Sequence, residues 1–220
     1  MDHARISELL RPFLEDASAP ASVLSGYQLS SISTYLDILL RWNARVNLTA
    51  ICDPEEILTR HFGESLFAAR HLFPEMRSTV HVIDVGSGAG FPGLPIKLWA
   101  RDIHLTLIES NNKKATFLRE VIRSLKLEDT EVFAGRAEEF SASADVVTLR
   151  AVERFESVLP TAISLVVPGG RIVLLSSASQ NEITATATGI SWRAGIPIPK
   201  SERRILNIGR RIYNAKDSKS

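Results

Sequence analysis

The sequence predicts an α/β fold, in which a doubly wound, mostly parallel sheet follows an N-terminal helical extension. An apolar run ends in Asp84 and is followed at once by glycines at alternate positions. From Val80 onward, short apolar runs alternate with helical stretches, whereas the residues before them show only the apolar spacing of helices. Such alternation is typical of parallel strands joined by helical crossovers. We therefore expect an extension over residues 1–77 and a sheet domain over residues 78–220.

Two helices of the extension can be placed. One helix face carries apolar residues at helical spacing, namely Ile32, Tyr35, Leu36, Leu39 and Leu40. A second helix is expected to begin after Asp53, because a capping acid followed by proline and two glutamates is typical of a helix start. It should run to about residue 71 and end before Pro74.

The sheet domain alternates strands and helices. The expected strands are residues 80–85, 104–109, 130–134, 145–149 and 171–175, and the expected helices are residues 94–100, 113–126 and 155–166. Pro168, Gly169 and Gly170 predict a turn before the last of these strands. Apolar pieces near Ile190 and at residues 205–212 are expected to supply the final strands.

Composition narrows the class of protein. A chain of 220 residues with 45% hydrophobic content can bury one substantial core, and a net charge of +1 gives no overall preference for nucleic acid or membrane. The charge is uneven, because the stretch from Arg193 onward holds eight basic residues and two acids, a net +6, which leaves −5 on residues 1–192. A basic end is compatible with a polyanionic partner, but taken alone it is more typical of a solvated surface.

The single cysteine, Cys52, excludes an intrachain disulfide and favours a reducing, cytoplasmic location. The five histidines lack the spacing of metal ligands, so no metal is expected. No apolar run is long enough to span a bilayer, and the first residues do not form a signal peptide. No membrane association is therefore expected.

The glycines after the first strand indicate a ligand site, because ligands of open parallel sheets bind beyond the carboxyl ends of the strands. Gly86, Gly88 and Gly90 would let the backbone approach a ligand, and Asp84 and Glu109 would stand at the tips of the first two strands. In the simplest alternative, the acids only cap strands and the glycines only form a turn.

Charge distinguishes the candidate ligands. Residues 88–93 fit the dinucleotide pattern G-x-G-x-x-G, but a pyrophosphate near Asp84 would cost on the order of 3 kcal/mol per like-charge pair. A P-loop is excluded because no Gly-Lys-Ser/Thr follows. S-adenosylmethionine fits better, because Asp84 would attract its sulfonium and ammonium groups and Glu109 would accept its ribose hydroxyls.

Two further segments belong to the predicted site. Ala137 and Glu138 follow the third strand, where backbone amides would read an adenine edge, although Glu138 alone also suits a helix start. Arg150 follows the fourth strand and is expected to contact cofactor or base; the alternative is an ion pair with an acid such as Glu153.

Several motifs together resemble the bacterial small-subunit ribosomal RNA (guanine-N7) methyltransferases, also known as the glucose-inhibited division protein B family. They are DVGSGAGFPGLP from Asp84, RAEEF from Arg136, LRA from Leu149, WNARVNLTA from Trp42 and RHFGES from Arg60, and the similarity covers residues 39–175. The resemblance implies a class I S-adenosylmethionine-dependent methyltransferase fold with a seven-stranded sheet, acting on 16S rRNA of the small ribosomal subunit. The chain is expected to be a monomer. The resemblance also implies cofactor contacts at Gly86, Phe91, Ala137, Glu138 and Arg150, and it suggests a substrate contact at Arg203. Arg204, next to it in the basic C-terminal stretch, is a second candidate for contact with RNA.

One departure concerns the substrate. The family usually carries Lys-Gly where this chain has Ser176 and Ser177, so a basic group near the site is missing there. A methyltransferase acting on a small molecule or protein, and a non-catalytic RNA-binding or assembly protein with a cofactor-like pocket, therefore remain alternatives. No catalytic residue is named, because guanine N7 already carries a lone pair and needs no general base.

Overall fold

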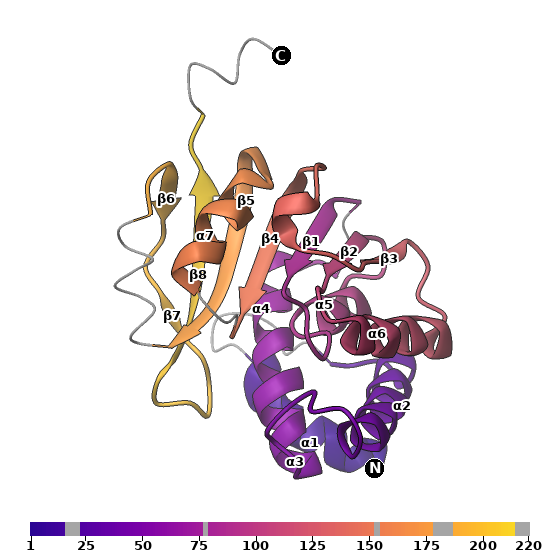
Figure 1. Ribbon diagram of the computed structural model, residues 1–220. Coiled ribbons are helices and arrows are strands. Elements are labelled where there is room, and N and C mark those ends of the chain that lie inside the picture. Colours follow the sequence, from indigo (N-terminus) through magenta and orange to yellow (C-terminus); the bar gives the residue numbers. More distant parts are fainter. Residues whose placement is uncertain (16–22, 77–78, 152–154, 178–186, 214–220) are drawn as a thin grey trace.

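A mixed sheet forms the centre of the protein (Figure 1). The computed structural model describes residues 1–15, 23–76, 79–151, 155–177 and 187–213. The strand order is β3-β2-β1-β4-β5-β8-β6, and β7 pairs with β8 beside this path. The first five strands of the order run parallel, whereas β8 is antiparallel to β5 and β6. The strands are β1 (His81–Val85), β2 (His104–Ile108), β3 (Thr130–Phe133), β4 (Ala144–Arg150), β5 (Val166–Ser177), β6 (Ile190–Trp192), β7 (Ile196–Pro197) and β8 (Arg204–Arg211).

Helices precede the sheet and connect its strands. They are α1 (His3–Leu14), α2 (Gly26–Asn43), α3 (Pro54–Ile57), the π-helix η1 (Leu58–Gly63), α4 (Glu64–Leu72), α5 (Gly93–Trp99), α6 (Asn112–Leu125), the 3-10 helix η2 (Ala137–Glu139) and α7 (Phe155–Ser164). Asp53 caps α3 by accepting the N–H of Glu56 at 2.8 Å, with proline at the first position, as the sequence predicts. The π-helix joins α3 to α4 without a break, so one helical rod runs from residue 54 to residue 72.

The predicted fold class is confirmed. Among the described residues, seven strands form the continuous path, and the two-residue β7 is additional. The predicted turn at Pro168–Gly170 is wrong, because these residues lie inside β5. There the pairing with β4 shifts from Ala144 opposite Val166 to Val146 opposite Arg171, so the intervening residues bulge from the ladder, and Gly169 takes φ +79°.

Apolar side chains alternate along the strands and bury both faces of the sheet. Val82 belongs to the cluster that holds α1, α2, α4, α5 and α6, whereas its neighbour Ile83 belongs to the cluster that packs on α7. The first cluster contains side chains from both sides of the predicted boundary near residue 77, and residues 77 and 78 themselves lie outside the described residues. The helical extension is thus packed directly on one face of the sheet.

Candidate functional site

The carboxyl ends of β1, β2 and β4 bring the predicted site residues to one edge of the sheet. In Figure 1 the arrowheads of β4 and β5 point towards the side of the molecule where α3 and α4 lie. Asp84 is in β1, Glu109 directly follows β2, and Arg150 ends β4. The glycine loop that follows β1 is tied to β2, because Ile108 O accepts the N–H groups of Gly86 and Ser87 at 2.9 and 3.0 Å.

Asp84 anchors the start of α5. Its side chain is fully buried, and its two carboxylate oxygens accept the Gly93 N–H at 3.2 Å and the Thr148 hydroxyl at 2.7 Å. Burial raises the pKa of Asp84 to about 6, against the opposing effect of these hydrogen bonds and of Arg150. The carboxylate is therefore ionised at neutral pH, and its negative charge lies directly beneath the glycine loop.

Glu109 holds the loop from the other side. One oxygen accepts the Gly88 N–H at 2.8 Å and the other accepts the Asn111 N–H at 2.7 Å, and the side chain is buried. The space beside Gly88 is open, since a Cβ built there would meet only Gly86 O, at 3.8 Å. A loop with open backbone and a carboxylate at its rim is a cradle for a ligand with hydroxyl or cationic groups.

An aromatic wall from the helical extension supports the loop. Tyr35 of α2 donates its hydroxyl to the carbonyl of Ala89, and its ring stacks on Phe91 with centroids 5.4 Å apart. The imidazole of His61, in the π-helix, lies 4.9 Å from the Phe91 ring on a tilt of 27°. Because a Cβ at Gly90 would overlap both the Tyr35 hydroxyl and the side chain of Leu94, this packing requires glycine there.

A buried ion pair connects the extension to β4. Glu64 accepts a hydrogen bond from the Arg150 guanidinium at 3.0 Å, with side chains 1% and 6% exposed, and Arg150 also donates to the Arg60 carbonyl at 2.7 Å. Arg60 and Arg204 approach the same carboxylate at 3.2 and 3.9 Å. Burial lowers the pKa of Arg150, and the charge of Glu64 opposes that effect. Arg150 thus pairs with Glu64 from a distant helix, whereas Glu153, the partner considered above, lies outside the described residues.

His61 shares this environment. Burial lowers its pKa to about 3, assisted by the charges of Arg150, Arg204 and Arg60, so the imidazole is neutral at physiological pH. Its Nε2 lies 2.8 Å from the Thr49 hydroxyl. Two buried nitrogens here, His61 Nδ1 and Arg150 Nε, have no hydrogen-bond partner among the described residues. A buried polar group without a hydrogen bond destabilises the folded protein. Two such nitrogens in one cluster beside the glycine loop are expected where a bound ligand supplies their hydrogen-bond partners.

The remaining predicted residues occupy different settings. Ala137 is buried in η2 and Glu138 is exposed. Arg203 is exposed, whereas Arg204 is half-buried and directed at Glu64, so Arg204 is the arginine at the site edge. Ser176 is buried and accepts a hydrogen bond from Asn207 at 2.8 Å. Ser177 pairs with Arg204 across β5 and β8, which places a cation at this sheet end although residue 176 is not a lysine.

Sequence reasoning missed Glu64 and His61 as site residues. The available signal was their spacing, since Ile57, His61, Glu64 and Ala68 fall on one helical face that is otherwise apolar. All four side chains are buried in the structure. A histidine and a glutamate on a buried face need polar partners. The partner of Glu64 is Arg150, which lies in a strand 86 residues later, so no local pattern reveals it, whereas His61 contacts the Thr49 hydroxyl twelve residues earlier.

Comparison with known proteins decides the family. The model of the family described as rRNA small subunit methyltransferase G (GidB) matches residues 28–197. The chain belongs to this family. Ribosomal RNA small subunit methyltransferase G from an Exiguobacterium species (strain ATCC BAA-1283 / AT1b) is 41% identical over 181 residues, covering 80% of this chain and 75% of the relative. Its counterpart from Bacillus subtilis strain 168 is 36% identical over 207 residues, covering 87% and 85%.

Solved structures agree on the fold of this family member. Pyrococcus horikoshii TYW2, crystallised in complex with MeSAdo, matches with a TM-score of 0.57 at 19% identity, covering 70% of this chain and 63% of that one. TrmN from Thermus thermophilus matches with a TM-score of 0.54 at 17% identity, covering 70% and 53%. At such identities the likeness concerns the fold alone, which is that of class I methyltransferases.

The residues present fit S-adenosylmethionine, the cofactor of this family. Two carboxylates, Asp84 and Glu109, hold the glycine loop, and the backbone beside Gly88 is open. Negative charge at this point favours a cationic ligand over a pyrophosphate. Within the described ranges, no group of three His, Cys, Asp or Glu side chains is arranged to hold a metal ion, and no helix there is long and apolar enough to cross a membrane.

Proposed function

We propose that this chain transfers a methyl group from S-adenosylmethionine to N7 of a guanine in 16S rRNA. Family membership supports this proposal, since relatives that match most of the chain are named for methyl transfer to small-subunit ribosomal RNA. The single observation that carries it is the carboxylate-lined glycine loop at the ends of β1 and β2, which fits the cationic cofactor. The proposed cofactor contacts are Asp84, Gly86, Gly88, Phe91, Glu109, Ala137, Glu138 and Arg150.

The cofactor supplies an electrophilic methyl group when it is bound. Guanine N7 attacks with its own in-plane lone pair, so the chain has no proton to remove. The neutral His61 agrees with such chemistry, because its pKa of about 3 leaves it unable to act as an acid, and too weakly basic to act as a base, near pH 7. The protein therefore acts by alignment, which supplies roughly 7–11 kcal/mol in favourable cases.

The buried carboxylates near the site set the electric field in which methyl transfer would take place. Methyl transfer would move positive charge from the cofactor to the purine, so a fixed negative group beside the purine would favour the transition state, whereas one beside the sulfonium favours binding of the cofactor. Asp84 is held rigidly by Gly93 and Thr148, and Glu64 is held by Arg150. These carboxylates cannot reorient, and their field is in place before the substrate arrives.

The proposed RNA contacts are Arg203 and Arg204 at the start of β8. Arg204 is directed at Glu64, and Arg203 is exposed beside it, so one arginine faces the site and the other faces solvent. We propose that both contact the RNA near its target base. The chain is proposed to act as a monomer in the cytoplasm, where small ribosomal subunits are found.

Labelled cofactor tests the function. The wild-type chain is incubated with S-adenosylmethionine carrying a labelled methyl group and, separately, with small subunits, extracted 16S rRNA or free guanosine. Label is expected in RNA as N7-methylguanosine, with none on guanosine, and Glu109→Gln should reduce incorporation at least tenfold because the loop loses an anionic anchor. Equal labelling of free guanosine, or no labelling of any RNA substrate, would reject the proposal.

A further inference from the structure

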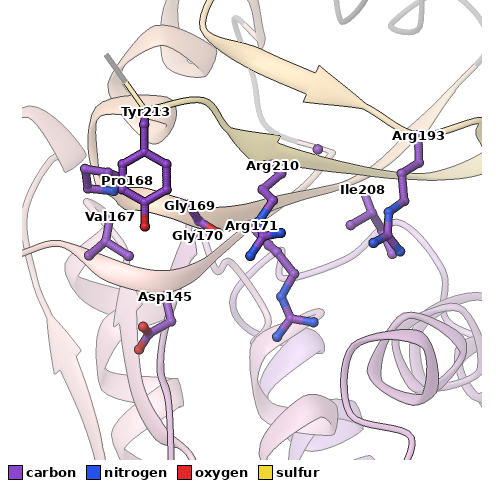
Figure 2. A pocket seen from close by; sticks show the side chains of 11 residues that line it. Asp145, Val167, Pro168, Gly169, Gly170, Arg171, Arg193, Ile208, Arg210 and Tyr213 are labelled. Carbon is purple, nitrogen blue, oxygen red and sulfur yellow. Dashed lines mark hydrogen bonds between the residues drawn. The ribbon is translucent and has the colours of Figure 1, made fainter. Parts of the chain in front are cut away.

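A pocket lies at the edge of the sheet opposite the glycine loop. It has a volume of about 470 Å³ and is bounded by the bulge of β5 and the end of β8 (Figure 2). Arg171 pairs with Val146 near the start of β4, whereas Arg150 of the candidate site ends that strand. At about 3.3 Å per residue, the two sites are separated by roughly 13 Å along β4.

Three arginines face this pocket. Arg171 comes from β5 and Arg210 from β8, while Arg193 directly follows β6, and Figure 2 shows their guanidinium groups directed into one space. Asp145 is the one carboxylate among the described residues that line the pocket, and it already accepts the His81 N–H at 2.9 Å. Positive charge therefore exceeds negative charge in this pocket.

The positive charges of these arginines repel one another. Burial lowers the pKa of Arg171, and the charges of Arg193 and Arg210 lower it further. Arg171 is nevertheless fixed in position, because it donates to the Leu72 carbonyl at 3.1 Å and lies over the Phe73 ring at 5.5 Å. Arg210 is likewise fixed by a hydrogen bond from its Nε to Gly169 O at 2.8 Å. An anion bound between these guanidinium groups would relieve their repulsion.

The chemistry of the lining favours a phosphate of a single-stranded nucleic acid. Guanidinium groups match phosphate oxygens with two parallel hydrogen bonds. Tyr213 lies at the rim with 73% of its surface exposed, next to Gly169, where a Cβ would come within 2.7 Å of the tyrosine hydroxyl. An exposed aromatic ring beside clustered arginines suits stacking of a base whose phosphate is held.

We propose that Arg171, Arg193 and Arg210 form a binding site for a backbone phosphate of the RNA substrate. The inference rests on the proposed function, because it assigns a second contact to the RNA that is methylated at the other sheet edge. The site holds the substrate and takes no part in methyl transfer.

The test compares RNA binding by the full chain and by Arg193→Ala/Arg210→Ala. Both side chains are exposed, so the double variant should fold and should bind S-adenosylhomocysteine as the wild type does. Its affinity for 16S rRNA is expected to fall at least tenfold near 150 mM salt, and the slope of log affinity against log salt is expected to decrease by about 1, because one phosphate contact is lost. Arg119→Ala, an exposed arginine on α6 outside the pocket, is the matched control and should change the slope less.

Each outcome decides between explanations. Unchanged affinity and slope in the double variant, while the wild type binds and methylates RNA, would overturn the pocket assignment and leave the proposed function standing. A loss in Arg119→Ala as large as the loss per arginine in the double variant would also overturn it, since it would show a diffuse charge effect. Wild-type binding of inorganic phosphate that the double variant loses, with RNA affinity unchanged, would assign the pocket to small anions. Failure of the wild type to methylate any RNA would count against the proposed function instead.

Discussion

Removing the buried charge of Glu64 should destabilise the protein and impair its site together. In Glu64→Gln the shape of the side chain is kept, but the Arg150 guanidinium, 3.0 Å away and with its side chain only 6% exposed, loses its counterion. Leaving one member of a buried pair uncompensated costs about 3–5 kcal/mol. The side chains of Arg60 and Arg204 are 40% and 20% exposed, so solvent screens their interactions with Glu64. The loss of stability therefore comes mainly from the unpaired charge of Arg150.

Thermal unfolding followed by circular dichroism measures the effect. In a chain of this size, each kcal/mol of lost stability lowers the melting temperature by about 2–4 °C, so we expect a decrease of roughly 6–20 °C. The control is Glu55→Gln, which breaks the exposed pair of Arg5 and Glu55 and should leave the melting temperature nearly unchanged. Glu64→Gln combined with Arg150→Met should recover stability without recovering cofactor affinity. A decrease of less than about 2 °C in Glu64→Gln would refute the reasoning.

Three further predictions concern the loop and its neighbours. Asp84→Asn should weaken binding of S-adenosylmethionine about tenfold in calorimetric titrations at pH 8. It should weaken binding of S-adenosylhomocysteine less, because that molecule lacks the sulfonium charge. The pKa of Asp84 is raised to about 6 in the folded state, so its ionised carboxylate lowers the free energy of unfolding above that pH. At pH 8, the melting temperature of Asp84→Asn should therefore be no lower than that of the wild type. The pKa of His61 is lowered to about 3, so the free energy of unfolding of the wild type should decrease by on the order of 4 kcal/mol as pH falls from 6.5 towards 3. In urea titrations, the free energy of unfolding of His61→Gln should decrease clearly less over the same range. An equal decrease in both proteins would contradict the assignment. Tyr35→Phe removes the hydrogen bond to Ala89 O, so it should lower the free energy of unfolding by about 1–3 kcal/mol and weaken cofactor binding. The control Tyr27→Phe, on the surface, should do neither.

Local signals predicted most of the fold. The capped helix after Asp53 and the strands that end near Asp84 and Glu109 are each encoded within a few residues, by caps, apolar runs and glycines. The Pro168–Gly170 segment misled because proline and glycine mark bulges as well as turns. Only the register with β4 distinguishes the two, and that register depends on residues far away in the sequence.

The candidate site was predicted less completely than the fold. Asp84 and Glu109 were visible because acids at strand tips beside glycines form a compact pattern. The functions of Glu64 and His61 were not visible, because their contacts with Arg150 and Phe91 form only when the extension packs on the sheet. The pocket lined by Arg171, Arg193 and Arg210 was hidden because its charges come from three segments that are far apart in the sequence.

Calorimetric titration of the wild-type chain with S-adenosylmethionine and with NADH tests the central claim most directly. The carboxylates of Asp84 and Glu109 should admit the sulfonium cofactor at micromolar concentration and exclude the dinucleotide, whose diphosphate would meet their charge. Heat of binding from NADH alone would show that the loop accepts a pyrophosphate and would contradict the account.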